Sequence, residues 1–420
     1  MKKAAIISLT IPEIPGKSGG EIRDIYMFRY LAGQFITDYF SLHNYFGQGE
    51  ADKDFLKSFA HVYEPRTVNE QYHSMVNEKV HLTVFEKARY KLSLKGRYVP
   101  CQKVPAEILG FRNEFNRYIK CFFEQCAKQE HYDYVFISPQ VNPAIIEDIE
   151  VPKKTKMIWA TYDVEKVRHH RLLQTKKSKT DQWFYRFEAA AACRYEKEAA
   201  AKSDGIIAVS ELDRKAFAEI YHLPSKKVLS VENGVDVDYF YAMDAKTDYK
   251  IVFIGNMGYS PNAQAVRYFV KEVFPEVLRK YPQASFYAVG TNPGQELKKL
   301  KAENIMITGR VSDVRDYLKI AHVVCVPLLA GSGTKYKVLE AMACEKPVVT
   351  THIGAEGLNV SDGENILIAD SAGEIAKRIG HLFEDQDRCR TIGRKAREFI
   401  LKNHDWNAVL PKINDWAENL

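Results

Sequence analysis

Short apolar runs alternate with amphipathic segments along most of this chain. In the first half the strand-sized runs are Ala4–Leu9, Tyr134–Ser138, Met157–Ala160 and Gly205–Val209, and the alanine-rich segment Trp183–Lys202 is expected to be a helix. Residues 49–123 are aromatic and charged, and several helices inserted between strands are expected there. This alternation is typical of parallel sheets covered by helices.

The alternation is most regular in the second half of the chain. The expected strands are Lys250–Ile254, Ser285–Val289, Ile305–Thr308, His322–Pro327 and Pro347–Thr351, and the expected helices are Asn262–Lys280, Asp313–Lys319 and Gly333–Cys344. A helical run from Ala372 to the end carries Trp406 and Trp416. Between the halves, Asn233-Gly234-Val235-Asp236 follows an expected strand at Lys227–Val231 and is a candidate hinge. The pattern therefore predicts an α/β protein with two domains.

Composition narrows the class of protein. Hydrophobic residues make up 46% and charged residues 27% of the 420 residues, as in ordinary globular proteins. Seven cysteines without a Cys-x-x-Cys pair favour neither a disulfide framework nor structural zinc. The apolar runs are too short to span a membrane, and no signal peptide is recognisable, so we expect a cytoplasmic protein.

The net charge of +6 is concentrated in one stretch, Lys153–Lys179. Such a run is either a solvated loop and helix face or a surface that meets anionic lipid headgroups or an anionic glycan, and both interpretations stay open. If the surface meets lipid headgroups, the protein would contact the inner face of a membrane peripherally. We expect no nucleic acid partner, because no recognition motif accompanies the charge.

Glycines with polar neighbours follow three of the expected strands, where open parallel sheets bind ligands. The first segment, Ile14–Gly20, precedes a helix and suits an anion, but it lacks the P-loop order and is equally compatible with a plain tight turn. The second, Phe253–Gly258, lacks the spacing of a dinucleotide fingerprint, which argues against a dehydrogenase.

The third glycine segment, Leu328–Ala343, is the most specific of the three. A turn around Gly331 exposes backbone amides, and a helix follows on which Lys337 and Glu340 share a face. A lysine with amide donors suits a diphosphate, and a carboxylate suits a ribose diol. A salt pair at a capped turn is the alternative, but it does not explain two charges on a helix rich in apolar residues.

The chain resembles family 4 of the retaining glycosyltransferases, which have the GT-B fold. The matching stretches are Gly19-Gly20, Ile207–Ser210, Glu232–Asp236 with Phe240, the Gly255 loop, Thr308–Val311, Gly331–Ala343, Pro347–Thr351 and Gly354–Leu358. The resemblance implies two Rossmann-like domains that face each other across a cleft. Residues 1–232 would bind the acceptor, residues 233–400 would bind a nucleotide-sugar donor, and a helix in 401–420 would pack back on the N-terminal domain.

The resemblance also implies residue roles. Glu340 matches the ribose-binding glutamate, Lys335 and Lys337 would meet the phosphates, and Gly19 and Gly20 would close on the phosphates from the other lobe. The predicted donor-binding residues are Gly19, Gly20, Gly255, Asn256, Arg310, Val311, Gly331, Ser332, Gly333, Thr334, Lys335, Lys337 and Glu340, and the predicted catalytic residues are Asp163, Lys337 and Glu340.

The sequence departs from the family pattern at two positions. Many members carry a sugar-contacting glutamate where this chain has Ser332, so Ser332, Thr334 and backbone amides would meet the sugar. Many members carry a histidine where this chain has Asp163, which would orient the acceptor or offset positive charge, or else cap the following helix.

Asp236-Val237-Asp238 looks like the metal-binding Asp-x-Asp of a different glycosyltransferase fold, but a turn is the better interpretation here. We therefore expect no metal and no cofactor, because lysines and amides can carry the leaving diphosphate.

The resulting hypothesis is a retaining, metal-independent glycosyltransferase that moves a sugar from a nucleotide-diphosphate donor to a glycan or lipid-linked acceptor in bacterial surface polysaccharide synthesis. One alternative is a catalytically silent binding subunit of a glycan-assembly complex, which the missing glutamate at Ser332 favours. A nucleotide-sugar epimerase on the same fold is a more distant alternative.

Overall fold

The computed structural model describes residues 1–8, 11, 19–41, 53–63, 123, 130–141, 143, 146, 149–174, 179–244, 248–331 and 333–420. The chain divides into two compact units, Met1–Val231 with Lys412–Leu420, and Glu232–Pro411. Ser332, residues 12–18 before Gly19 and all of 64–122 lie outside the described residues, and so do most of the helices expected between 49 and 123.

The first unit contains a seven-stranded parallel sheet with the order β3-β2-β1-β4-β5-β6-β7. Its strands are β1 (Lys3–Ser8), β2 (Ile36–Ser41), β3 (His61–Tyr63), β4 (Tyr134–Ile137), β5 (Lys156–Ala160), β6 (Gly205–Ala208) and β7 (Val228–Ser230). The central strands are buried on both faces, which explains why they read as continuous apolar runs.

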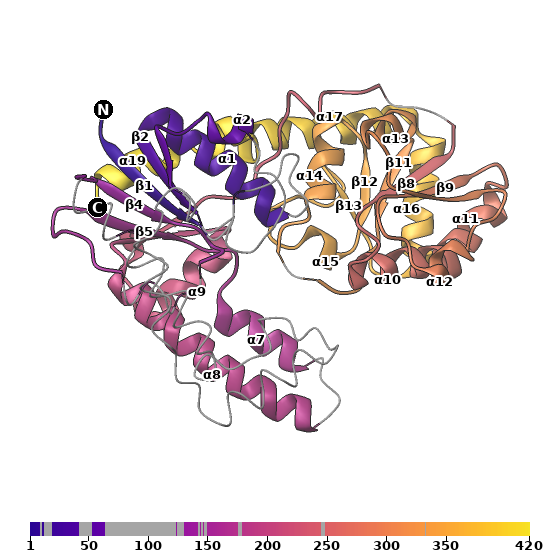
Figure 1. Ribbon diagram of the computed structural model, residues 1–420. Helices are drawn as coiled ribbons and strands as arrows, with labels where there is room; N and C mark the ends of the chain where they lie inside the picture. Colours follow the sequence, from indigo (N-terminus) through magenta and orange to yellow (C-terminus); the bar gives the residue numbers. More distant parts are fainter. Residues whose placement is uncertain are drawn as a thin grey trace. The chain divides into compact units, whose positions relative to one another are not determined.

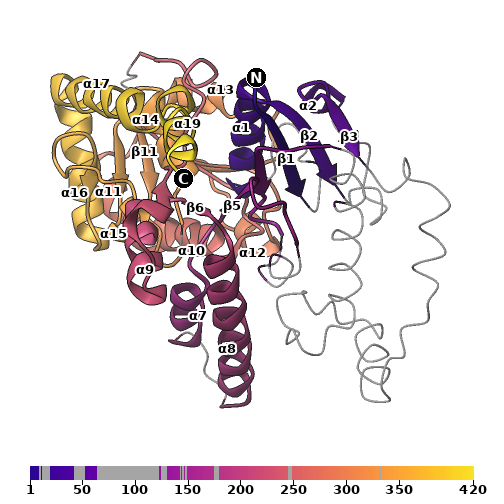
Figure 2. The same cartoon turned by 90° about the vertical axis from the view of Figure 1, so that its left-hand side faces the viewer.

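Helices of the first unit cover this sheet and extend beyond it. They are α1 (Gly19–Gln34), α2 (Lys53–Leu56), α7 (Glu165–Gln174), α8 (Lys179–Lys202), α9 (Glu211–Tyr221) and α19 (Lys412–Glu418). Figures 1 and 2 show α7 and α8 side by side, extending away from the strands. The long α8 matches the expected helix Trp183–Lys202 and begins four residues earlier.

The second unit contains a six-stranded parallel sheet with the order β10-β9-β8-β11-β12-β13. The strands are β8 (Lys250–Ile254), β9 (Ser285–Val289), β10 (Ile305–Gly309), β11 (Val323–Val326), β12 (Val348–Thr350) and β13 (Leu367–Ile368). All but β13 were expected from the sequence within two residues at either end. The two-residue β13 at the sheet edge carries too little apolar pattern to be recognised.

Helices of the second unit pack around this sheet (Figure 1). They are α10 (Ser260–Tyr268), α11 (Phe274–Lys280), α12 (Gln295–Lys298), α13 (Arg315–Ile320), α14 (Tyr336–Ala343), α15 (His352–Ala355), α16 (Ala372–Glu384), α17 (Gln386–Asn403) and α18 (Trp406–Val409). The single helix expected at Asn262–Lys280 is interrupted by a π turn at Phe269–Val273. Pro275 follows this turn and lacks the amide that a regular helix would use.

The two tryptophans near the end of the chain belong to different units, although we expected both to brace the first. Trp406 packs on Gly234 in the second unit, where a Cβ at that glycine would lie 2.5 Å from the indole. Trp416 packs on Gly205 of β6 in the first unit and donates a hydrogen bond to the Lys226 carbonyl at 2.8 Å. The chain therefore joins the first unit at Lys412 rather than at residue 401.

The candidate hinge Asn233–Asp236 is held within the second unit. Val235 donates its amide to the His404 carbonyl at 2.7 Å, and the His404 ring lies 2.9 Å from the Asn233 carbonyl. Asp236 accepts from the amides of Asp238 and Tyr239 at 3.0 and 2.8 Å. The Asp-x-Asp sequence is thus an aspartate-capped turn, as its neighbours had suggested.

Candidate functional site

Two glycines bring the ends of β8 and β9 into backbone contact. A Cβ on Gly290 would lie 1.9 Å from the Gly255 carbonyl oxygen, and Gly290 has a φ of +143°, which other residues rarely adopt. The Gly255 amide donates to the Val289 carbonyl at 2.9 Å. The predicted donor-binding residue Gly255 is therefore placed by the neighbouring strand as well as by its own.

Three asparagines fix the turn that follows Gly255. Asn256 Oδ1 accepts from the Gly258 amide at 2.9 Å and from Asn292 Nδ2 at 3.3 Å. Asn262, in the first turn of α10, donates from Nδ2 to the Asn256 carbonyl at 2.9 Å. Its Oδ1 accepts from Lys337 Nζ at 3.1 Å. The turn after β8 and helix α14 are thus joined through one buried amide.

The turn around Gly331 precedes α14 and follows β11, which is the neighbour of β8 in the sheet. Gly331 and Gly333 have positive φ values of 133° and 71°, so α14 begins at Tyr336 rather than at Gly333 as expected. Lys335 occupies the N-cap position, is buried, and donates from Nζ to the Gly333 carbonyl at 2.5 Å. Thr334 is half-buried between them.

Lys337 and Glu340 are half-buried on α14, which buries its apolar residues against the core. Burial raises the pKa of Glu340 to about 7, against the opposing effect of Lys337. Burial also lowers the pKa of Lys337 to about 8, against the opposing effect of Glu340. Within the part of the chain that the structure describes, no hydrogen bond reaches the Glu340 carboxylate and no carboxylate lies within 4 Å of Lys337 Nζ. Lys337 and Glu340 therefore form no direct ion pair with each other, although each acts on the pKa of the other.

The end of β10 carries the other predicted donor-binding residues. Gly309 has a φ of 75°, and it is followed by the exposed Arg310 and the half-buried Val311. In the same sheet β10 is separated from β8 by β9. Arg310 and Val311 thus lie at the same edge of the sheet as Gly255, two strands away.

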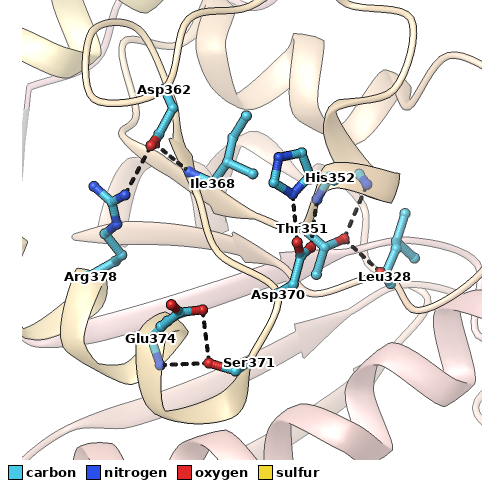
Figure 3. A network of polar contacts seen from close by, with 10 residues as sticks. Leu328, Thr351, His352, Asp362, Ile368, Asp370, Ser371, Glu374 and Arg378 are labelled. Atoms are coloured by element: carbon cyan, nitrogen blue, oxygen red, sulfur yellow. Dashed lines mark hydrogen bonds and ion pairs between the residues drawn. The ribbon is translucent and has the colours of Figure 1, made fainter.

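Side-chain contacts also fix the neighbouring ends of β11, β12 and β13 (Figure 3). Thr351 donates to the Leu328 carbonyl at 2.6 Å and accepts from the Gly354 amide at 3.1 Å. Asp370 binds the amide and ring of His352 at 2.9 and 2.5 Å. Because Leu328 leads directly into the Gly331 turn, Thr351 supports that turn from the next strand.

A second group of predicted residues lies in the first unit, around the start of α1. Gly20 packs against the Tyr162 ring, which would lie 2.8 Å from a Cβ at that position. Tyr162 donates to Asp24 Oδ2 at 2.7 Å, and Gln140 Nε2 and Ser138 Oγ approach the same oxygen at 3.0 and 3.4 Å. Asp24 is fully buried, and burial raises its pKa to about 7 although these hydrogen bonds oppose the shift.

Asp163 follows Tyr162, is half-buried, and precedes α7. The first amides of α7 are bound by another carboxylate, since Glu196 of α8 accepts from Glu165 and Lys166 at 2.8 and 3.4 Å. Both roles considered for Asp163, orienting an acceptor or capping α7, remain predictions.

The basic stretch Lys153–Lys179 does not form one continuous run of free cations. Lys153 and Lys154 precede the amino end of β5, whereas α7 follows its carboxyl end. Arg168 pairs with Glu165 and His169 Nε2 lies 3.2 Å from the same carboxylate, while Lys166 and His170 are exposed. Residues 175–178 lie outside the described part.

The described residues include no group of three or more His, Cys, Asp or Glu side chains placed to hold a metal ion. Among the same residues, no helix combines the length and apolarity needed to cross a bilayer.

The structure thus places Gly255, Asn256, Gly331, Gly333, Thr334, Lys335, Lys337 and Glu340 at neighbouring strand ends of the second unit, whereas Gly19, Gly20 and Asp163 belong to the first. Sequence reasoning missed Asn262 and the pair formed by Tyr162 and Asp24. Asn262 had a recognisable signal, because a polar residue at a helix start six positions after Asn256 faces the same turn. Asp24 had no recognisable signal in the sequence, because polar and apolar residues are mixed along the helix on which it lies.

Residues 248–385 match the sequence model of the family described as glycosyl transferases group 1. This match lies entirely within the second unit. The chain is 24% identical over 291 residues to an uncharacterized 44.6 kDa protein in the cps region of Klebsiella pneumoniae. This match covers 67% of this chain and 73% of that protein. It is 24% identical over 219 residues to the O-antigen biosynthesis glycosyltransferase WbnH of Escherichia coli, covering 50% of this chain and 60% of WbnH, less than two thirds of its length.

The chain is also similar in structure to Alr3699/HepE of Anabaena, crystallised in complex with UDP and glucose. The two share a TM-score of 0.63 and 14% identity, and the match covers 100% of both chains. At that identity the likeness shows the fold alone. The prediction of two Rossmann-like α/β halves in the GT-B class is confirmed.

Proposed function

We propose, from the premise of a glycosyl transferases group 1 domain at 248–385, that the chain transfers a sugar from a nucleotide-diphosphate donor with retention of anomeric configuration. One observation carries the proposal: Lys337 and Glu340 share the half-buried face of α14 at a glycine turn, and neither charge is satisfied by the other. Two such charges cost free energy in the absence of a ligand, and a nucleoside diphosphate supplies a partner for each.

The proposed chemistry assigns one task to each group. The Glu340 carboxylate accepts hydrogen bonds from the ribose diol, and Lys337, Lys335 and the amides of the Gly331 turn stabilise the leaving diphosphate. Because these cations offset the developing charge, the transfer proceeds without a metal ion. The acceptor hydroxyl attacks from the face that the diphosphate leaves, and the leaving phosphate takes its proton. Asp163 orients the acceptor or offsets oxocarbenium-like positive charge.

The acceptor side of the proposal is a glycan or lipid-linked glycan of a bacterial surface polysaccharide. Support comes from the relatives, one in a cps region and one in O-antigen biosynthesis. A cytoplasmic protein could meet such an acceptor at the inner face of the membrane, and the exposed Lys166 of α7 offers positive charge for anionic headgroups. Loss of binding to anionic vesicles at physiological salt in Lys166→Glu would support this contact, and absence of vesicle binding by the wild type would contradict it.

A catalytically silent binding subunit is the second candidate. It is favoured by one observation, the presence of Ser332 where many relatives of the resembled family carry a sugar-contacting glutamate.

The decisive experiment measures calorimetric binding of UDP, GDP, ADP, dTDP and CMP in the presence of EDTA. We expect tight binding of one diphosphate, and a loss of about tenfold to a hundredfold in Glu340→Gln, because a charge-assisted hydrogen bond contributes roughly 1.5–3 kcal/mol. Glu303→Gln, at an exposed position of the same unit, is the matched control and should bind as the wild type does.

Binding alone does not distinguish the two candidates, and product analysis does. Donor hydrolysis or transfer that is lost in Glu340→Gln would exclude the silent subunit, and NMR of the anomeric proton in the product tests retention. If no diphosphate binds above background, the donor-site assignment is wrong.

A further inference from the structure

A single buried amide connects the glycine turn after β8 with the lysine of α14. Asn262 is 4% exposed, and its side chain contacts both the Asn256 carbonyl at 2.9 Å and Lys337 Nζ at 3.1 Å. Gly255 leaves room for this arrangement, since a Cβ there would lie 2.8 Å from Asn262 Nδ2 and 3.1 Å from Lys337 Cε.

The two contacts determine which way the Asn262 amide points. A carbonyl oxygen can only accept, so the group that faces Asn256 must be the amide NH₂. An ammonium can only donate, so the group that faces Lys337 must be the amide oxygen. Each half of the side chain therefore has one defined partner, and the amide cannot rotate without losing both.

The partner of the lysine is neutral. An ammonium has three hydrogens to donate, and Asn262 takes one of them without cancelling the positive charge. The neighbouring Lys335 also donates from its ammonium to an uncharged group, the Gly333 carbonyl. A carboxylate at either place would hold a lysine equally well but would neutralise it.

We propose that Asn262 is a positioning residue that holds the Lys337 ammonium in place while leaving its charge available to the diphosphate of the donor. This inference rests on the proposed function, because it requires that the anion at this site be the diphosphate. Asn262 acts through Lys337 and does not itself contact the donor.

The test compares a charged and an uncharged ligand. Affinities for UDP and for uridine are measured by calorimetry and by ligand-observed NMR on the wild type, Asn262→Ala and Asn262→Asp; if another base is preferred, its diphosphate and nucleoside are used. We expect Asn262→Asp to lose at least about tenfold in diphosphate affinity, more than Asn262→Ala, because the new carboxylate pairs with the lysine. Uridine affinity should change less than about twofold, because uridine carries no charge for Lys337 to meet.

Gln264→Glu is the matched control, since it adds the same charge at an exposed position of the same helix and should leave diphosphate affinity within about twofold of the wild type. A double-mutant cycle with Lys337→Met serves if Asn262→Asp does not fold: Asn262→Ala should have no further effect once the lysine is gone.

The outcomes separate the inference from the function on which it rests. If the wild type binds none of the diphosphates, the proposed function fails. The role assigned to Asn262 is wrong if the wild type binds one diphosphate and both Asn262 variants bind it as tightly as the wild type does. It is also wrong if the variants lose affinity for the diphosphate and for the nucleoside to the same extent.

Discussion

At the scale of single residues, the candidate site depends on positions where a side chain would collide with a neighbouring backbone. Gly290 is the sharpest case, because it combines a left-handed φ with a Cβ position 1.9 Å from the Gly255 carbonyl oxygen. Either feature alone would resist substitution, and together they require that the ends of β8 and β9 separate if any side chain is added.

Gly290→Ala should therefore destabilise the second unit by about 2–4 kcal/mol, the sum of overpacking and backbone strain. Chemical unfolding followed by tryptophan fluorescence measures this loss. The control is Gly294→Ala, four residues away, where nothing lies within 4 Å of the new Cβ and φ is −62°. Equal stability of the two variants would contradict the argument.

Donor binding should depend on pH through two ionisable groups, one that gains its charge and one that loses its charge as pH rises. The pKa of Glu340 is raised to about 7, so its carboxylate ionises, and binds the ribose better, as pH rises through 7. The pKa of Lys337 is lowered to about 8, so its charge is lost as pH rises through 8. Diphosphate affinity should thus be greatest between about pH 7 and 8.

Calorimetry across pH 6.5–9 measures this profile. In Glu340→Gln the limb on the acid side should flatten while the alkaline limb remains, because only the carboxylate has been removed. A profile unchanged by this substitution would show that other groups control the pH dependence.

At the scale of elements, the regular alternation of apolar and polar segments was sufficient to predict most strands and helices. It failed where tertiary contacts rather than local pattern decide, as in β3 and β13, which are short strands at sheet edges. It also began α14 three residues too early, because the positive φ of Gly333 in the preceding turn is invisible in the pattern.

The candidate site was recognisable to a similar extent. The strand ends with glycines were identified from spacing, because chemistry in parallel sheets gathers at one edge. Asn262 and Asp24 were not identified, because their roles come from partners that are distant in sequence, such as Lys337 and Tyr162. The basic stretch was misleading as a unit, since β5 divides it and Glu165 pairs with part of it.

Asp24 makes α1 sensitive to pH through its contacts with the loops after β4 and β5. Its pKa rises from 3.8 when unfolded to about 7 when folded, so between these values the folded state keeps a proton that the unfolded state has lost. Stability from this group is present at low pH and falls as pH rises through this window. A tenfold change in proton affinity corresponds to about 1.4 kcal/mol.

Asp24→Asn should consequently show a smaller decrease in the free energy of unfolding between pH 5 and pH 8 than the wild type does. Urea unfolding at both pH values measures the difference. Glu150→Gln, at an exposed position of the same unit, should leave the wild-type slope intact. A slope in Asp24→Asn as steep as that of the wild type would contradict this assignment.

At the scale of the whole molecule, the chain passes from the first unit to the second after Val231 and returns at Lys412. The return places α19 on β6, with Trp416 against Gly205 and Glu418 3.3 Å from Lys2. The first strand and the last helix of the sequence therefore belong to the same unit, in which α19 packs on the sheet that contains β1.

Trp416→Ala should destabilise the first unit by about 2–3 kcal/mol, because a half-buried indole loses its packing and its hydrogen bond to the Lys226 carbonyl. Hydrogen exchange should become faster in β6 and β7 and stay unchanged in β8. Trp406→Ala is the paired variant, and its effect should appear in the second unit instead. Faster exchange in both units for either variant would show that they do not unfold separately.

The return of the chain at Lys412 has a consequence for biosynthesis. A ribosome that has finished the first 231 residues must still add the 180 residues 232–411 before it begins to synthesise α19. At about 5–20 residues per second, this delay is roughly ten to forty seconds. During that time Gly205 and the neighbouring face of β6 lack the indole that covers them in the finished protein. The half made first is thus the last to mature, and a nascent chain stalled before Lys412 should display an uncovered first unit to chaperones and proteases.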